Sequence, residues 1–252
     1  MRLSQSRIEA ALPELAVEVL QEVDSTNSEA KRRLRAGLTE PLLLAAEHQT
    51  AGRGRQGKSF YSPDATGIYM TLTVHPDAPL TDAVSVTTRA SVAVCRAIRQ
   101  VTGLQPEIKW VNDLYLGGKK ICGILVEAES DFAAGITKHL VIGVGVNVTT
   151  ADFPEDLTEA ASLSVDADRD LLIAAIAREL LRETADLQDR SYLEDYRRHS
   201  MVLGKPVVWM LNGERREATA VEIDEEGGLV VEDADGTRRT LQSGEISLRV
   251  RG

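Results

Sequence analysis

The eight residues 52–59, Gly-Arg-Gly-Arg-Gln-Gly-Lys-Ser, constrain the fold more than any other segment of this chain. Their spacing fits both the P-loop pattern and the dinucleotide-binding fingerprint. Glycines let backbone N–H groups approach an anion closely, and arginine grips phosphate or carboxylate with a forked set of donors. A solvated basic loop without a ligand is the plainer alternative. In a chain whose formal net charge is −10, this concentration of cations and glycines favours an anion-binding loop, above all for phosphate.

Both named patterns require the loop to follow a strand and to open directly into a helix. The apolar run at 42–46 does read as a buried strand. Residues 60–67 cannot form a helix, because Pro63 lacks a backbone donor and Gly67 marks a second turn. The run at 68–74 is again rich in β-forming residues. The loop is therefore predicted to join two strands, and both pattern matches are false.

The rest of the first part of the chain alternates strands and helices. Strands are predicted at 17–23, 42–47, 68–74, 107–111 and 139–148, a hairpin at 113–116 and 119–127 across Gly117-Gly118, and helices at 27–36 and 82–102. A capping box at Thr26–Glu29 should begin the first helix, and Gly37 should end it. Gly103 should end the second.

Two more helices follow, and after them the sequence pattern changes to short β-like runs. One helix is predicted at 168–188, with Leu172, Ile176, Leu180 and Leu187 on one face, and another at 192–199. From about residue 203, short β-like runs alternate with turns at Asn212-Gly213, Gly227-Gly228 and Asp235-Gly236. This spacing is typical of a small, strongly curved sheet or barrel.

Composition excludes several classes of protein. No apolar run approaches the ~18 residues of a membrane span, and the N-terminus lacks the apolar core of a signal peptide. Cys95 and Cys122 stand alone in apolar surroundings, which indicates a reducing cytoplasm. The four histidines show no metal-ligand spacing, and the acidic balance argues against a nucleic-acid partner.

Four further clusters place polar residues or glycines at the ends of predicted elements, namely 24–27, 109–113, 119–127 and 143–147. The first stands at a helix N-terminus, where simple capping explains each residue equally well. The second puts a cation, an amide and a carboxylate at the end of a buried strand. The third places lysines at the start of an otherwise apolar strand. The fourth has glycines within a strand, which indicates that another group approaches the backbone closely there.

In their order along the chain, these segments resemble the signatures of bacterial biotin–protein ligases. That family carries Ser-Thr-Asn, Gly-Arg-Gly-Arg, Lys-Trp-Pro-Asn-Asp, Lys-(Ile/Leu)-Ala-Gly-Ile-Leu-Val-Glu and Gly-x-Gly-x-Asn. They stand here as Ser25–Asn27, Gly52–Arg55, Lys109–Asp113, Lys120–Glu127 and Gly143–Asn147, and the match also includes Glu47–Ala51 and Gly244–Leu248. The resemblance covers about residues 17–250. Val111 in place of the usual proline and Cys122 in place of the usual alanine are the departures.

The resemblance implies an α+β fold in two domains. Residues 1–200 are expected to form a catalytic domain similar to class II aminoacyl-tRNA synthetases, with a mixed sheet and flanking helices. Residues 201–252 are expected to form a small C-terminal SH3-like β-barrel. Some members of the family add an N-terminal DNA-binding domain, for which residues 1–24 leave no room, so the chain resembles the monofunctional ligase.

The implied reaction has two halves. The carboxylate of biotin attacks the α-phosphorus of ATP, giving biotinyl-5′-AMP and pyrophosphate. A lysine of a biotin carboxyl carrier protein, a domain of acyl-CoA carboxylases, then displaces AMP. Because a carboxylate is already an ionised nucleophile, the first half needs cations that stabilise charge on the phosphate oxygens rather than a Ser-His-Asp array.

The resemblance also assigns roles to residues. The catalytic cations would be Arg55, Lys109 and Lys120, assisted by Mg²⁺ with Asp113 as its ligand. The biotin pocket would comprise Ser25, Thr26, Asn27, Gln49, Gly52, Arg53, Gly54, Arg55, Lys120, Gly123 and Gly143. The nucleotide would contact Arg55, Lys58, Phe60, Lys109, Asn112 and Asn147, with Phe60 packing on the adenine.

The expected partners are biotin, ATP and the carrier domain, with neither nucleic acid nor membrane, in a cytoplasmic monomer or weak homodimer. Two other functions stay open. A lipoate or octanoate ligase or transferase would share the fold but lacks the Gly-Arg-Gly-Arg loop. A biotin-responsive repressor would need a DNA-binding domain.

Overall fold

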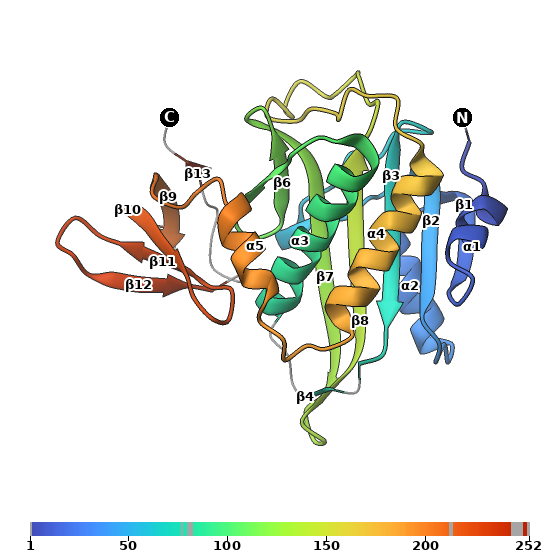
Figure 1. Ribbon diagram of the computed structural model, residues 1–252, viewed down its shortest axis with the longest axis horizontal. Helices are drawn as coiled ribbons and strands as arrows, with labels where there is room; N and C mark the ends of the chain where they lie inside the picture. The colour runs from blue at the N-terminus through green and yellow to red at the C-terminus, as the bar shows by residue number, and fades with distance from the viewer. Residues whose placement is uncertain (1, 77, 80–82, 212–213, 243–248, 251–252) are drawn as a thin grey trace.

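The larger of two sheets is mixed, and its strands lie between residues 16 and 147 (Figure 1). The computed structural model describes residues 2–76, 78–79, 83–211, 214–242 and 249–250. Within these residues the strand order is β1-β2-β3-β8-β7-β6-β5, with β4 paired to β8. The strands are β1 (Ala16–Val23), β2 (Leu42–Gln49), β3 (Gly67–Val74), β4 (Ala78–Pro79), β5 (Glu107–Lys109), β6 (Asp113–Leu116), β7 (Lys119–Asp131) and β8 (Ile136–Asn147). β1 and β2 are parallel, and the other neighbouring pairs are antiparallel.

Helices cover both faces of this sheet. They are α1 (Gln5–Ala11), α2 (Thr26–Arg35), α3 (Ala83–Thr102), α4 (Arg169–Thr184) and α5 (Tyr192–His199), with a 3₁₀ turn η1 (Arg55–Gly57). α3 and α4 lie on one face and α2 on the other (Figure 1). In β2, Leu43 and Ala45 belong to the main core, whereas Leu42 and Leu44 pack with α2. A strand buried on both faces needs apolar residues at every position, which explains the unbroken apolar run.

A second, antiparallel sheet follows α5, with the order β12-β11-β10-β9-β13 in the described residues (Figure 1). Its strands are β9 (Pro206–Leu211), β10 (Glu214–Ile223), β11 (Leu229–Glu232), β12 (Arg238–Leu241) and β13 (Arg249–Val250). Val207 and Trp209 belong to the same buried cluster as the core of the main sheet. Trp110 Nε1 donates to the carbonyl oxygen of Gly227 at 2.9 Å. The two sheets therefore share a continuous core.

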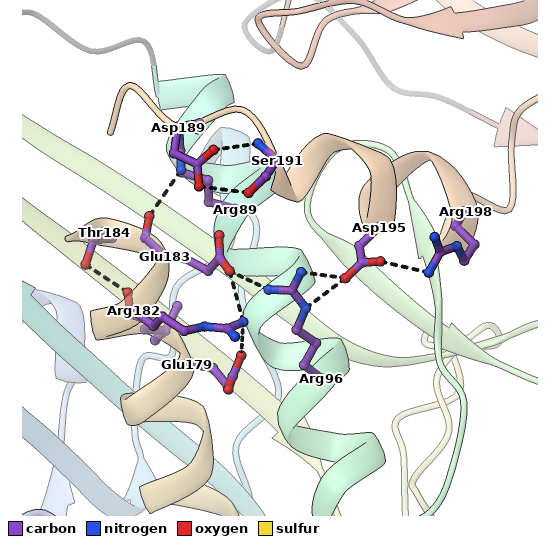
Figure 2. Close-up of polar contacts among 11 residues, drawn as sticks. Arg89, Arg96, Glu179, Arg182, Glu183, Thr184, Asp189, Ser191, Asp195 and Arg198 are labelled. Carbon is purple, nitrogen blue, oxygen red and sulfur yellow. Dashed lines mark hydrogen bonds and ion pairs between the residues drawn. The ribbon is translucent and has the colours of Figure 1, made fainter. Parts of the chain in front are cut away.

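A polar network joins α3, α4 and α5 (Figure 2). Arg96 of α3 contacts the carboxylates of Glu183 in α4 and Asp195 in α5. Arg89 of α3 is buried, lies 4.3 Å from the ring centroid of Tyr192, and donates to backbone carbonyls at the end of α4 and in the connection to α5. These contacts fix α5 between the main sheet and the second sheet.

Helix α2 lies where the sequence predicts a helix, but the predicted capping box is wrong. Ser25 is the N-cap and makes no side-chain capping hydrogen bond. Glu29 instead pairs with Arg32 and Arg33, so ion pairs along the helix replace the local cap. Gly37, with a φ of 97°, stands just beyond the helix C-cap as predicted.

Other boundaries also differ from prediction. The strand predicted at 107–111 ends at Lys109, because Lys109 pairs with Asp113 and the three residues between them must form the turn. The helix predicted at 168–188 ends at Thr184, where Arg89 takes carbonyls that a longer helix would use. Leu187 is buried beyond that end. Helix α1 was not predicted, because seven residues carry too little periodic signal.

Some sequence features fall outside the described residues, namely the turn Asn212-Gly213 and the motif Gly244–Leu248. Cys95 and Cys122 are both buried and unpaired, and burial raises the pKa of each thiol. None of the helices formed by the described residues has the length and apolar character needed to cross a membrane.

Candidate active site

The loop between β2 and β3 folds as a narrow turn rather than as the start of an α-helix. Arg53 and Ser59 form an isolated antiparallel bridge, and the tip between them is η1. Gln56 and Gly57 at the tip have φ values of 55° and 73°, a region that glycine enters at low cost. β2 and β3 are antiparallel neighbours. The prediction that this loop joins two strands is confirmed, and neither phosphate-binding template applies.

This loop forms one wall of a cavity of about 640 Å³ on the α2 side of the main sheet. Fifteen of the residues predicted for the site line it: Ser25, Thr26, Asn27, Gln49, Arg53, Gly54, Arg55, Lys58, Phe60, Lys109, Asn112, Asp113, Lys120, Gly123 and Gly143. They come from the N-terminus of α2, the end of β2 and the β2–β3 loop, the hairpin of β5 and β6, and strands β7 and β8. The fold thus brings together segments that are more than one hundred residues apart in the sequence.

Polar side chains at the N-terminus of α2 form one end of the cavity. Thr26 donates to Gln49 Oε1 from its backbone nitrogen at 2.9 Å and from its hydroxyl at 3.2 Å. Gln49 in turn donates to the Ser62 hydroxyl at 2.8 Å. The Thr71 hydroxyl lies 2.7 Å from Asn27 Oδ1 in the buried layer below. These bonds hold hydroxyl and amide groups in fixed orientations, as recognition of a polar ring requires.

The glycines of the sheet make room for protein side chains. A Cβ at Gly143 would lie 2.0 Å from Asn27 Oδ1, so this glycine admits the Asn27 amide. Gly123 and Gly145 are opposite each other in β7 and β8, and the Phe60 ring lies on both. Close approach was predicted at this strand, but in the structure the approaching groups are Asn27 and Phe60.

The two arginines of the loop reach across the cavity in different directions. Arg53 forms a bidentate pair with Glu127 at 3.0 and 3.2 Å. Arg55 donates to Asn112 Oδ1 at 2.9 Å. Burial lowers the pKa of the Arg55 guanidinium, although the nearby charge of Asp113 acts in the opposite direction. A buried cation of this kind is stabilised by an anionic ligand.

Two lysines, together with the arginines, make up the cationic part of the cavity wall. Lys120 Nζ lies 2.7 Å from Asp113 Oδ1. Lys109 Nζ donates to the Tyr115 hydroxyl at 3.1 Å, and that hydroxyl donates to Glu159 at 2.9 Å. Burial, reinforced by the bond to Glu159, raises the pKa of Tyr115. Because the phenol stays neutral, it can orient the ammonium group of Lys109.

The side chains alone do not form a metal centre. In the part of the chain that the structure describes, no three His, Cys, Asp or Glu residues are arranged to hold a metal ion. Asp113 accepts from Asn112 Nδ2 at 2.9 Å as well as from Lys120. Because Asn112 turns its amide nitrogen toward Asp113 and its oxygen toward Arg55, the candidate metal ligand is the Asp113 carboxylate. A single carboxylate suits Mg²⁺ when phosphates and water supply the other ligands, as is usual for this ion.

Two predicted site residues lie outside the cavity lining. A Cβ at Gly52 would lie 2.4 Å from the carbonyl oxygen of Phe60, so Gly52 is needed where the two arms of the loop pack together. Asn147 is buried at the end of β8, and its Nδ2 donates to the carbonyl oxygen of Ala161 at 3.0 Å. Asn147 thus anchors the segment that follows β8.

That segment contributes a wall that sequence reasoning missed. Residues 156–160 line the cavity. Lys120 donates from its backbone nitrogen to the Glu159 carbonyl at 2.7 Å, and its own carbonyl accepts from Ala161 at 2.8 Å. Trp110 and Tyr115 also line the cavity and were not predicted. Trp110 lies within the segment 109–113 that was already singled out, and Tyr115 lies in the predicted hairpin strand at 113–116. Residues 156–160 carry no pattern that distinguishes them from a solvated loop.

Comparison with known proteins agrees with this geometry. Residues 19–147 match the biotin/lipoate A/B protein ligase family, and residues 202–249 match the biotin protein ligase C terminal domain. The chain is 32% identical to the bifunctional ligase/repressor BirA of Bacillus subtilis, over 90% of this chain and 72% of that protein. It is 30% identical to the biotin–[acetyl-CoA-carboxylase] ligase of Mycobacterium tuberculosis, over 91% of this chain and 88% of that one.

A solved structure is similar over nearly the whole fold. The biotin protein ligase from Aquifex aeolicus in complex with biotin and ATP has a TM-score of 0.80 and 25% identity, covering 94% of this chain and 99% of that one. The first family match contains the basic loop, the turn after β5, and the glycine-bearing strands that build the cavity. The chain therefore belongs to the biotin/lipoate A/B protein ligase family and, within it, to the biotin protein ligases.

Proposed function

We propose that this chain is an ATP-dependent biotin–protein ligase, which activates biotin as biotinyl-5′-AMP and transfers it to a lysine of a carrier protein. The observation that carries the proposal is the cavity, in which hydroxyl and amide groups at the N-terminus of α2 face a group of cations. Relatives support it: one is named a biotin–[acetyl-CoA-carboxylase] ligase, and another was solved with biotin and ATP.

The biotin ring binds at the α2 end in this proposal. Its ureido group presents two N–H donors and one carbonyl acceptor, which hydroxyl and amide side chains can satisfy. Ser25 is buried and makes no capping bond, so its hydroxyl can donate to the carbonyl. Thr26, Asn27 and Gln49 supply the remaining polar groups. The backbone of Arg53, Gly54 and Arg55 closes the side of the pocket, with Gly52 shaping the loop.

The cations serve the first half-reaction. A carboxylate oxygen of biotin forms a bond to the α-phosphorus of ATP, and the bond from that phosphorus to pyrophosphate breaks. Negative charge builds up on the phosphate oxygens, and preorganised cations stabilise it most strongly in a water-poor site. We assign this role to Arg55, Lys109 and Lys120, with Lys58 at the outer rim.

The nucleotide occupies the other end of the cavity. Asn112 and Asp113 face the phosphates, and Phe60 packs on the adenine with the ring face that the sheet glycines leave open. Asn147 contributes by holding the segment after β8 in place. The carboxylate of Asp113 would hold a Mg²⁺ that arrives with ATP. When bound, this ion would neutralise phosphate charge and assist the departure of pyrophosphate.

In the second half-reaction, the amine of an acceptor lysine attacks the acyl carbon of the adenylate, and AMP leaves. The acceptor is a biotin carboxyl carrier protein of the acetyl-CoA carboxylase type, following the name of the Mycobacterium tuberculosis relative. We further propose a catalytic domain at residues 1–200, similar to class II aminoacyl-tRNA synthetases. Residues 201–252 would then form an SH3-like barrel that acts in transfer, because the proposed biotin ligands all precede it.

Incubation of the purified protein with labelled biotin, Mg-ATP and a biotin-carrier domain tests the proposal. Label should enter the carrier domain and should depend on ATP and on the acceptor lysine. Lipoate and octanoate in parallel reactions provide the comparison, because related ligases and transferases use them. Transfer of lipoate or octanoate without transfer of biotin would contradict the proposal.

A further inference from the structure

Glu127 holds together three parts of the candidate site and has no role in the reaction described above. It lies in β7, just outside the cavity lining. Its carboxylate accepts from Lys31 Nζ at 2.7 Å and from Asn27 Nδ2 at 3.1 Å, both in α2. It also accepts hydrogen bonds from both terminal nitrogens of Arg53 in the basic loop. A single carboxylate thus connects the helix, the loop and the sheet.

The geometry of these contacts fixes both polar partners. A bidentate guanidinium–carboxylate pair is directional, so Arg53 can reach Glu127 only when the loop lies over the cavity. The Asn27 amide is bounded on one side by the Thr71 hydroxyl, at 2.7 Å from Oδ1, and on the other by Glu127. Glu127 and the carbonyl oxygen of Leu125, which lies 3.3 Å from Asn27 Nδ2, therefore set the direction of the Asn27 donor, and Glu127 holds the loop at the same time.

The surroundings make the ion pair effective. The Glu127 side chain is only 22% exposed, and that of Arg53 is 40% exposed. Lys31 is as shielded as Glu127, so two cations converge on one half-buried carboxylate. The three donors together keep the pKa of Glu127 below its ordinary value, although burial, the largest single influence, acts against them. The contacts with the loop and with α2 therefore favour the charged form of this carboxylate.

We propose that Glu127 is a positioning residue that latches the basic loop over the ligand and couples this closure to Asn27 at the biotin end. The inference rests on the proposed function. It assigns Glu127 to the retention of biotin and its adenylate rather than to the chemistry at phosphorus. The alternative is that Glu127 only anchors α2 to the sheet through Lys31.

The central variant is Glu127→Gln, which keeps the shape and leaves an oxygen for Asn27 but removes the charge that holds Arg53. Glu129→Gln is the matched control, because Glu129 lies on the same side of β7 and its side chain makes no hydrogen bond or ion pair with any residue that the structure describes. Lys31→Met removes the other cation and leaves the Arg53 pair intact, so it separates the latch from the anchor.

Two measurements report on the latch. The first is trypsin cleavage of the ligand-free protein at Arg55 and Lys58, which depends on loop opening and not on any activity. The second is the lifetime of enzyme-bound biotinyl-adenylate after a chase with unlabelled biotin. Glu127→Gln should speed both cleavage and adenylate loss by ~5-fold or more, the effect of losing a partly shielded ion pair. Pyrophosphate exchange at saturating biotin and ATP should change by less than about twofold, because the reacting groups stay in place.

Glu129→Gln should behave as wild type, and Lys31→Met should show a much smaller effect than Glu127→Gln. Adding Arg53→Gln to Glu127→Gln should accelerate cleavage no further, because both changes remove the same interaction. Arg53→Gln alone tests the pair if Glu127→Gln does not fold. Unchanged cleavage in Glu127→Gln, or an equal effect in Lys31→Met, would overturn the latch. A wild-type protein that forms no adenylate would refute the proposed function and leave the cleavage test valid.

Discussion

Lys120 stands where an apolar strand meets the cavity, paired with Asp113 at 2.7 Å. Lys120→Ala should slow biotin-dependent pyrophosphate exchange at least tenfold, because removing a charged partner from a partly desolvated site typically costs ~2–5 kcal/mol. Circular dichroism should show an intact fold. Lys119→Ala is the control, since the Lys119 side chain is exposed and donates to the backbone carbonyl of Thr158. An exchange rate in Lys120→Ala equal to wild type would shift the role to another cation.

Gly145 and Gly123 support the same aromatic ring but differ in how closely they approach it. A Cβ at Gly145 would lie 2.5 Å from the Phe60 ring, whereas one at Gly123 would lie 3.2 Å from it. Gly145→Ala should therefore displace Phe60 and cost ~1–3 kcal/mol, the usual range for overpacking. Gly123→Ala should cost clearly less. Denaturant unfolding measures stability, and the KM for ATP measures the effect on the nucleotide. Equal effects from both changes would show that Phe60 does not occupy this position.

At the scale of elements, α2 presents the polar groups of the cavity and is held from both ends. A hydrogen bond from Arg32, in the last turn, is the main reason that the pKa of Asp24 falls to about 2. Asp24 precedes the N-cap, so this ion pair connects the segment before the helix to the last turn of the helix. The helix is therefore sensitive to acid at the end that faces the candidate biotin site.

The direction of the acid effect follows from the lowered pKa. Because the folded-state value lies below the ordinary value of 3.8, the contribution of Asp24 is present above pH ~4 and is lost as the pH falls towards 2. Asp24→Asn should be less stable than wild type at pH 5, and the difference should shrink by pH 2. The effect should be small, since the side chain is 45% exposed. Thermal unfolding between pH 2 and 5 measures it, and a pH-independent difference would refute it.

At the scale of the whole molecule, the second sheet contacts the main one through the turn at Gly227. The carbonyl of this residue accepts from Trp110, whose side chain also lines the cavity. On the other side of the turn, a Cβ at Gly227 would lie 2.9 Å from the Thr88 hydroxyl in α3. The position of the second sheet is thus connected to a wall of the candidate site through one turn.

Gly227→Ala should weaken this contact and can be compared with Gly236→Ala. The two glycines have φ values of 84° and 85°, but a Cβ at Gly236 would meet nothing within 4 Å. Gly236→Ala should cost only the backbone strain, ~1–2 kcal/mol. Gly227→Ala should cost ~1–3 kcal/mol more because of the clash. Denaturant unfolding measures both. Equal losses would mean that the turn does not pack on α3 as tightly as its geometry implies.

Much of the architecture could be predicted from local signals. The unbroken apolar run in β2, the glycines that end α2 and α3, and the Gly117-Gly118 hairpin act within a few residues. Such signals depend on the conformational freedom of the backbone and on the periodicity of apolar side chains, so they can be recognised from the sequence alone. The predicted capping box at Thr26–Glu29 was wrong because contacts with other residues decided the outcome. Both end residues found partners elsewhere, Thr26 in Gln49 and Glu29 in two arginines.

The sequence by itself determined the chemical character of the site: a basic loop between two strands, a polar helix N-terminus, and lysines at the ends of apolar strands. Only the tertiary structure decided how these groups meet. It placed Phe60 on Gly123 and Gly145, made Glu127 the common partner of α2 and the loop, and brought residues 156–160 against Lys120. These contacts join residues far apart in the chain, and their free energy depends on shape and burial rather than on local propensity.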